Sequence, residues 1–223
     1  MTPTIAALIN ARLLSSRLPN KLILPFAGRT LIDVALEKLA AADFFAVRYL
    51  AAAEDELLRR VHDHRNIVPL VRDPKAVQPG YNGNENVFAH CRAITTDYIF
   101  WLNPCSPLLS VDTMRSACDY VRQTHFNSYT SVVETHDWIF DDAGLPVTNR
   151  QPTMLSTAHS PKFYRVAHAF HIYNTAFFLK SFVPWTFTRH DPELVRIPDE
   201  ESFDVNTPVE FAVAEQAYTR ARG

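Results

Sequence analysis

The side chains most able to do chemistry are concentrated in the segment 10–21. It contains three cations and two hydroxyl groups: Arg12, Arg17, Lys21, Ser15 and Ser16. The segment follows the apolar run 5–9 and precedes Gly28 and a helix that we expect to begin at Thr30. A cationic, hydroxyl-rich loop between a strand and a helix can hold phosphate groups through its charges, hydroxyls and backbone amides. The alternative interpretation is a solvated loop with ordinary surface cations.

The strands and helices around this loop must position it. Signals for strands and helices alternate along the chain. We expect strands at 5–9, 44–51, 67–71, 97–102, 128–134 and 170–173, and helices at 54 onward, 84–94, 110–125, 175–182 and from 207. The alternation up to about residue 134 predicts a mostly parallel sheet covered by helices. Ligands of such sheets bind beyond the carboxyl ends of the strands, so the loops 10–21, 51–55 and 103–108 should share one rim.

The length of 223 residues predicts a single domain over 1–223 with a substantial core. The segment of about 134–174 is rich in hairpin signals, because Trp138–Phe140 and Leu145–Val147 are separated by a short acidic turn with a glycine. We expect it to form an antiparallel insertion that could contact a second copy of the chain.

The composition is that of an ordinary globular protein, with 47% hydrophobic and 21% charged residues. The net charge of −2 argues against a nucleic-acid partner, which would call for a basic surface. We expect no membrane segment, no secretory signal and a cytoplasmic location. The three cysteines, Cys91, Cys105 and Cys118, have no metal-ligand spacing and are expected to be reduced structural thiols.

Four segments in chain order resemble motifs of the cytidylyltransferases that make CMP-activated acidic sugars, such as the N-acylneuraminate, 3-deoxy-manno-octulosonate and spore-coat polysaccharide types. They are Asn10–Lys21, Gly83–Val87, Asn103–Leu108 and Asp204–Pro208. The resemblance implies a three-layer α/β/α fold like that of the nucleotide-diphospho-sugar (GT-A) transferases, with a small antiparallel extension used in homodimers. It also implies that CTP and an acidic sugar react, with Mg²⁺ as cofactor, to give a CMP-sugar and pyrophosphate for surface glycan synthesis.

The resemblance also implies roles for individual residues. The nucleotide would be bound by Asn10, Ala11, Arg12, Ser15, Arg17, Lys21, Arg72 and Asn84, with Arg12 and Lys21 stabilising the transition state. The acceptor would be bound by Asn103, Ser106 and His168, and the metal by Asp204 and Asn206. Three of these assignments have structural alternatives: Arg72 as a surface arginine, Asn103 as the cap of a turn, and Asp204 with Asn206 as part of the turn before a helix.

The chain departs from the motifs at three positions. Leu14 stands where most relatives have Gly or Ala, Ala53 falls in a run that otherwise carries hydroxyls and a shorter acid, and Asn206 replaces a second carboxylate. These departures keep two other hypotheses open beside a cytidylyltransferase for an acidic sugar. One is a catalytically impaired nucleotide-binding or assembly module on the same fold, and the other is a nucleotidyltransferase with another nucleotide or acceptor.

Overall fold

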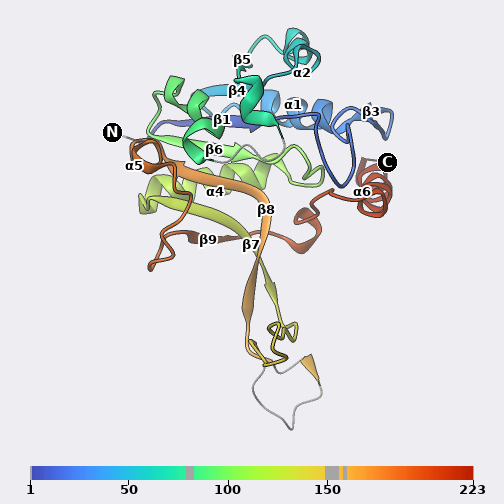
Figure 1. The fold of residues 1–223 in the computed structure, drawn as a ribbon, viewed down its shortest axis with the longest axis vertical. Coiled ribbons are helices and arrows are strands. Elements are labelled where there is room, and N and C mark those ends of the chain that lie inside the picture. The colour runs from blue at the N-terminus through green and yellow to red at the C-terminus, as the bar shows by residue number, and fades with distance from the viewer. Residues whose placement is uncertain (1, 79–82, 149–155, 158–159, 223) are drawn as a thin grey trace.

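The computed structural model describes residues 2–78, 83–148, 156–157 and 160–222. Its centre is a seven-stranded sheet in the order β5-β4-β1-β6-β8-β7-β9 (Figure 1). The strands are β1 (Ile5–Asn10), β4 (Val47–Ala52), β5 (Val68–Val71), β6 (Tyr98–Leu102), β7 (Ser128–Thr135), β8 (Phe163–Asn174) and β9 (Glu193–Arg196). Only β8 runs antiparallel to its neighbours, so the expected mostly parallel α/β sheet is confirmed. A short separate hairpin pairs β2 (Pro25–Phe26) with β3 (Arg29–Thr30).

Helices cover both faces of this sheet, which gives three layers. They are α1 (Leu31–Ala41), α2 (Asp55–Arg59), α3 (Asn84–Val87), α4 (Val111–Thr124), α5 (Thr175–Ser181) and α6 (Pro208–Arg222). Short 3₁₀ turns, η1 (Arg60–Asp63), η2 (Pro74–Val77), η3 (Ala89–Ala93) and η5 (Asp199–Glu201), join them. Among the described residues, no helix has the combination of length and apolarity that crossing a membrane requires.

Local signals set the starts of the long helices. The side chains of Thr30, Ser110 and Asn174 each accept a hydrogen bond from a backbone N–H in the first turn of the helix that follows. At α6 the Glu210 carboxylate accepts hydrogen bonds from the backbone N–H and the hydroxyl of Thr207. Each cap satisfies amides that the helix itself cannot pair, and all four starts agree with the sequence prediction.

Besides the β2–β3 hairpin, which was not predicted, three elements differ from the prediction. The helix expected over 84–94 is the single turn α3 followed by η3, and β9 was not predicted. Strand β8 begins at Phe163 rather than near 170, because its first half pairs with the end of β7 instead of forming a loop. The shorter prediction was wrong because Tyr164–Val166 are exposed or half-buried and carry no apolar alternation.

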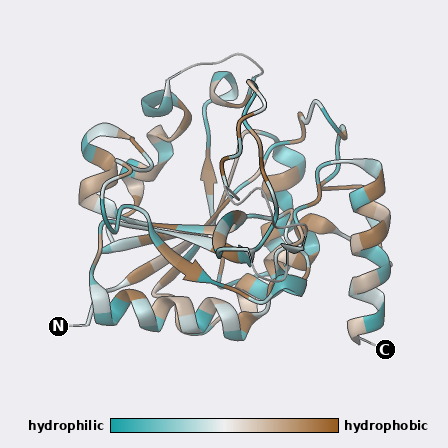
Figure 2. Ribbon diagram, turned by 90° about the horizontal axis from the view of Figure 1, so that it is seen from below, coloured by the Kyte–Doolittle hydropathy of each residue, from teal (hydrophilic) through white to brown (hydrophobic). Residues whose placement is uncertain are grey.

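The core explains why β1 is an unbroken apolar run. Ile5, Ala7 and Ile9 pack on one face of the sheet, whereas Ala6 and Leu8 pack on the other. A central parallel strand is covered by helices on both sides, so neither set can be polar. In Figure 2 hydrophobic residues run along the central strands, and the covering helices mix hydrophobic and hydrophilic residues. The three cysteines are all free and buried, as expected.

A bulge interrupts the pairing of β7 with β8. Thr130 pairs with His171 but Val132 pairs with Val166, so Ser131 alone faces the stretch 167–170. The buried Ser131 hydroxyl accepts hydrogen bonds from the N–H groups of Ala169 (3.0 Å) and Phe170 (3.2 Å). Within the bulge His168 adopts a left-handed backbone, with φ of 55°. Bulges of this kind re-aim a side chain, and here the residue that is re-aimed is His168.

Beyond the bulge, β7 and β8 leave the body of the sheet as a two-stranded ribbon (Figure 1). The chain between them continues with an antiparallel bridge between Phe140 and Pro146, at the predicted hairpin. Residues 149–155 and 158–159 of the predicted insertion lie outside the described residues.

A buried cation fixes the loop that follows β6. The Lys38 ammonium, on α1, donates hydrogen bonds to the carbonyl oxygens of Ser106 (2.7 Å), Pro107 (3.2 Å) and Leu109 (3.1 Å). Since Lys38 is 9% exposed, these bonds replace most of the hydration that the ammonium loses on folding. The loop conformation therefore depends on a side chain from another element.

We predict that Lys38→Met lowers the free energy of unfolding by about 3 kcal/mol, because it leaves three buried carbonyl oxygens without their donor. Urea denaturation followed by circular dichroism measures the change. The control is Lys180→Met, at an exposed lysine on α5, which should cost less than about 0.5 kcal/mol. Equal effects of the two substitutions would show that the Lys38 bonds contribute nothing to stability.

Candidate active site

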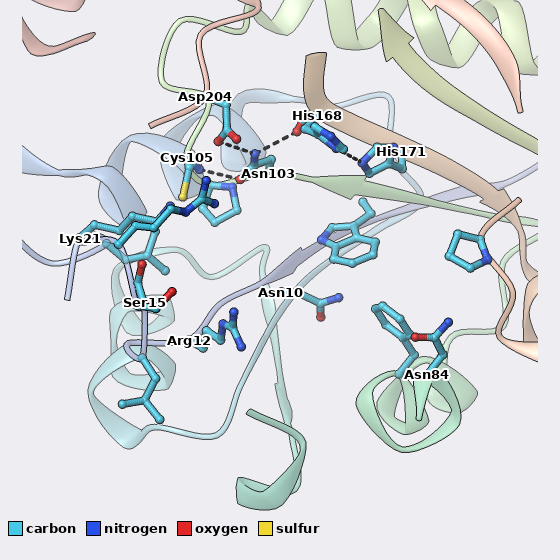
Figure 3. A pocket seen from close by; sticks show the side chains of 18 of the residues that line it. Asn10, Arg12, Ser15, Lys21, Asn84, Asn103, Cys105, His168, His171 and Asp204 are labelled. Carbon is cyan, nitrogen blue, oxygen red and sulfur yellow. Dashed lines mark hydrogen bonds between the residues drawn. The ribbon is translucent and has the colours of Figure 1, made fainter. Parts of the chain in front are cut away.

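A cavity of about 810 Å³ opens at the carboxyl ends of the central strands (Figure 3). Its walls include Asn10, Arg12, Leu14, Ser15, Arg17, Lys21, Asn84, Phe88, Trp101, Asn103, Cys105, His168, His171, Tyr173, Trp185, Phe187 and Asp204. Nine predicted site residues are among them: Asn10, Arg12, Ser15, Arg17, Lys21, Asn84, Asn103, His168 and Asp204. The structure thus brings residues of all four motifs to one place, together with two of the three predicted rim loops, 10–21 and 103–108.

All three cations of the first loop line one end of this cavity. The loop is held against the end of β4, because the N–H of Ala11 donates to the carbonyl oxygen of Ala51 (2.9 Å). The Glu54 carboxylate accepts hydrogen bonds from the N–H groups of Leu13 (2.8 Å) and Ala53 (3.2 Å). Glu54 therefore ties two loops together, a role that local sequence could not reveal because its partner lies 41 residues away.

The cations meet the loop before α6 through one neutral side chain. The Oδ1 atom of Asn206 accepts hydrogen bonds from Arg17 (2.7 Å) and from the Lys21 ammonium (3.1 Å). Lys21 also donates to the carbonyl oxygen of Val205 (2.6 Å). Two positive charges are thus held side by side, and among the described residues no carboxylate forms an ion pair with either, which suits an anionic ligand.

Asn103 links the other two walls. Its Nδ2 atom donates to the carbonyl oxygen of His168 (2.9 Å) and to Oδ1 of Asp204 (3.0 Å), while its Oδ1 accepts from the N–H of Cys105 (2.9 Å) (Figure 3). Asn206 donates through Nδ2 to the other Asp204 oxygen, Oδ2 (2.6 Å). Burial raises the pKa of the Cys105 thiol to about 11, opposed by the nearby Lys21 charge, so this thiol is no nucleophile at neutral pH.

The donor set that could hold Mg²⁺ is a single carboxylate. Each oxygen of Asp204 accepts one amide hydrogen bond and keeps further acceptor capacity. Asn206 turns its oxygen toward the cations instead of toward a shared ion. Among the described residues no three His, Cys, Asp or Glu side chains are grouped to share a metal. This set fits Mg²⁺, which takes one or two carboxylates and otherwise waters and substrate phosphates, through Asp204.

The opposite end of the cavity is aromatic and without a described cation. Its walls are Phe88, Trp101, Tyr173, Trp185 and Phe187. Trp101 packs edge-on against Phe88, with ring centroids 5.1 Å apart. These residues were not predicted as site residues. Trp101 and His171 pair across β6 and β8 and share one face of the sheet, a register that the sequence did not reveal.

Two histidines stand between the ends of the cavity. The rings of His168 and His171 are hydrogen-bonded (Nδ1 to Nε2, 3.3 Å), and the other His171 nitrogen contacts the Thr130 hydroxyl (2.9 Å). Burial, and then the neighbouring His168, lowers the pKa of His171 to about 3. His171 is therefore neutral at physiological pH, and the aromatic end favours uncharged groups.

Four predicted site residues do not line this cavity. Ala11 is buried and presents its carbonyl to the Arg72 guanidinium (3.4 Å). Arg72 is itself buried behind the loop and also donates to the carbonyl of Val87 (3.3 Å), so it braces the loop and is no surface arginine. Ser106 is fully buried within the loop that Lys38 holds. Asn206 lies beside a second cavity.

Leu14, one of the departures from the motifs, does line the main cavity, with 42% of its surface exposed.

The second cavity, of about 280 Å³, adjoins the first. Its walls include Arg165, His168, Ser202, Asp204, Asn206 and Glu210. His168 and Asp204 line both cavities. They therefore stand where a molecule in the second cavity would meet one in the first.

Comparison with known proteins agrees with this geometry. The sequence profile described as "Cytidylyltransferase" matches residues 6–217. No curated protein sequence matches the chain.

Two solved structures share the fold. One is CMP:2-keto-3-deoxy-manno-octonic acid synthetase complexed with CTP, with a TM-score of 0.65 and 12% identity, covering 98% of this chain and 99% of that one. The other is 4-diphosphocytidyl-2C-methyl-D-erythritol synthase from Anaerococcus prevotii, with a TM-score of 0.68 and 11% identity, covering 97% and 98%. At these identities the likeness concerns the fold alone.

We predict that Glu54→Ala makes the Leu13 and Ala53 amides exchange their hydrogens about ten- to a hundredfold faster, because each loses a bond to a charged acceptor. Hydrogen exchange read by mass spectrometry over peptides 11–21 and 50–54 measures it. Glu56→Ala is the matched control, since Glu56 is exposed on α2. Unchanged protection in Glu54→Ala would mean that other contacts hold the two loops together.

Proposed function

Because this chain belongs to the cytidylyltransferase family, we propose that it transfers the CMP group of CTP to a hydroxyl of an acidic sugar, releasing pyrophosphate, for surface glycan synthesis. The enzyme class, a nucleotidyltransferase that uses CTP, follows from the family. The observation that carries the proposed CMP transfer is the cluster of Arg12, Arg17 and Lys21, which lines the same cavity as Asp204.

The chemistry follows from the arrangement of charges. An acceptor hydroxyl oxygen attacks the α-phosphorus of CTP and gives up its proton to water, the bond from that phosphorus to the bridging oxygen breaks, and pyrophosphate leaves with the negative charge. Arg12 and Lys21 stabilise the charge that develops on the phosphates, and Lys21 is fixed by its bonds to Val205 and Asn206 before the substrate arrives. Mg²⁺ at Asp204, when bound, supplies further positive charge to the leaving pyrophosphate.

Two features support an acidic sugar as acceptor. Asn103 and His168 offer polar groups beside Asp204, where an acceptor hydroxyl would approach the phosphate. Arg165 in the adjoining cavity can pair with the carboxylate of the same molecule. One of the two solved structures that share the fold is a 4-diphosphocytidyl-2C-methyl-D-erythritol synthase. A non-acidic alcohol is therefore the competing outcome when acceptors are tested.

We propose further that the chain forms a homodimer through its ribbon. The ribbon projects from the body, and the chain between its two strands exposes apolar side chains, with Phe140 at 58% and Leu145 at 63%. Ile139, Val147 and Tyr164 add to the same extension. Several exposed apolar side chains on one extension suit a contact with another protein, and a second copy offers the same surface in self-complementary form.

We predict that saturating CTP with Mg²⁺ raises the melting temperature by about 5–10 °C and that Lys21→Ala removes most of the gain, because Lys21 lies in the cation cluster. Differential scanning fluorimetry measures it, and pyrophosphate release with a panel of acidic sugars and alditols identifies the acceptor. Lys75→Ala, at an exposed lysine outside the cavity, should keep the gain. A melting temperature that CTP and Mg²⁺ leave unchanged in the unsubstituted protein would refute the proposal.

We predict that Phe140→Asp weakens self-association at least about tenfold, because it places a charge in the centre of an apolar contact. Sedimentation velocity over a concentration series measures the dissociation constant. Val71→Asp is the control, since Val71 is 75% exposed at the far edge strand β5. If the unsubstituted chain is monomeric at every concentration, the dimer proposal fails.

A further inference from the structure

We propose that Asn206 is a positioning residue that holds Arg17 and Lys21 for the triphosphate, so that CTP binds to this chain before, and without, a divalent ion. The inference rests on the proposed use of CTP. It reassigns the residue that the resemblance placed among the metal ligands.

The contacts of Asn206 carry the inference. Its oxygen accepts from both cations, Arg17 at 2.7 Å and Lys21 at 3.1 Å. Its amide nitrogen donates to Asp204 Oδ2 at 2.6 Å. The planar amide therefore lies between the carboxylate and the cations with each end satisfied by the correct partner, and a flipped amide would oppose both.

Bonds of the backbone also hold this residue in place. The N–H of Asn206 donates to the Glu210 carboxylate (2.9 Å) in the capping box of α6. The neighbouring carbonyl of Val205 accepts from the Lys21 ammonium (2.6 Å). The residue is thus fixed from its main chain as well as its side chain, and the cations meet a preformed acceptor.

Charge decides what this acceptor does for CTP. A carboxylate at position 206 would form ion pairs with Arg17 and Lys21 and would compete with the phosphates for them. It would also face Asp204 at hydrogen-bond distance, and two adjacent carboxylates repel unless a proton or a cation lies between them. A neutral amide avoids both effects, so the two cations keep their full charge for the ligand.

The triphosphate consequently has enough fixed positive charge without a metal. Arg12, Arg17 and Lys21 together oppose the charge of the triphosphate, and Asp204 is separated from Arg17 and Lys21 by the Asn206 amide. Mg²⁺ at Asp204 then bears on turnover more than on nucleotide affinity. A chain with two carboxylates there would instead bind the nucleotide more weakly when the ion is absent.

The experiment measures the CTP dissociation constant by isothermal titration calorimetry, in EDTA and in Mg²⁺, for the unsubstituted chain and for Asn206→Asp. In the unsubstituted chain we expect the two conditions to differ less than about tenfold. In Asn206→Asp we expect binding in EDTA to weaken at least about tenfold and Mg²⁺ to restore most of the loss. The substitution is nearly isosteric, so a purely structural role for Asn206 would not produce this dependence on Mg²⁺.

Two further variants serve as controls. Asn206→Ser removes the positioning amide without adding charge, and should weaken CTP binding equally with and without Mg²⁺. Asn127→Asp adds the same charge at an exposed site just before β7, at the end of the strand away from the cavity, and should bind CTP as the unsubstituted chain does.

Each outcome decides the proposal. Binding by the unsubstituted chain only when Mg²⁺ is present overturns the inference about Asn206 and leaves the proposed function standing. Unaltered binding of CTP in EDTA by Asn206→Asp also overturns it. Absence of CTP binding in both conditions overturns the proposed function itself. The measurement on the unsubstituted chain stands whether or not either variant folds.

Discussion

Two amide side chains hold the walls of the cavity together without adding charge. Asn103 joins the loop after β6 to the β8 backbone and to Asp204, and Asn206 joins Asp204 to the cations of the first loop. An amide can do this because it carries a donor and an acceptor on one rigid group. Without this chain of bonds the carboxylate and Lys21 would not keep a fixed separation, and the opposed charges on which phosphate chemistry depends would not be held in place.

The same chain reaches into the sheet through the bulge in β8. Ser131 binds the bulge from the β7 side, and Asn103 binds it from the β6 side through the carbonyl of His168. A left-handed backbone is unfavourable for a residue with a side chain, so it persists only where the surroundings impose it. Here they do, and the strained residue lies in the wall shared by the two cavities.

Charged groups at this end of the molecule divide into two kinds. Arg12, Arg17 and Lys21 line the cavity, whereas Glu54 and Lys38 form hydrogen bonds with backbone groups of the surrounding loops. Glu54 and Lys38 make the loops rigid, so that the three cations can oppose the charge of a ligand without a rearrangement of the loops. The aromatic end has no described cation and a neutral His171, so the cavity separates charged from uncharged parts of its ligands.

The sequence by itself determined what depends on neighbours along the chain: the helix starts at Thr30 and Ser110, the doubly buried β1, and the cationic loop that begins after it. Those features follow from hydrogen bonds and burial patterns within a few residues. Only the tertiary structure decided which predicted residues meet. Lys21 contacts Asn206 across 185 residues, and Arg72 turns behind the loop because its carbonyl partners lie there. Such pairings depend on strand order and on the bulge, which no local pattern encodes.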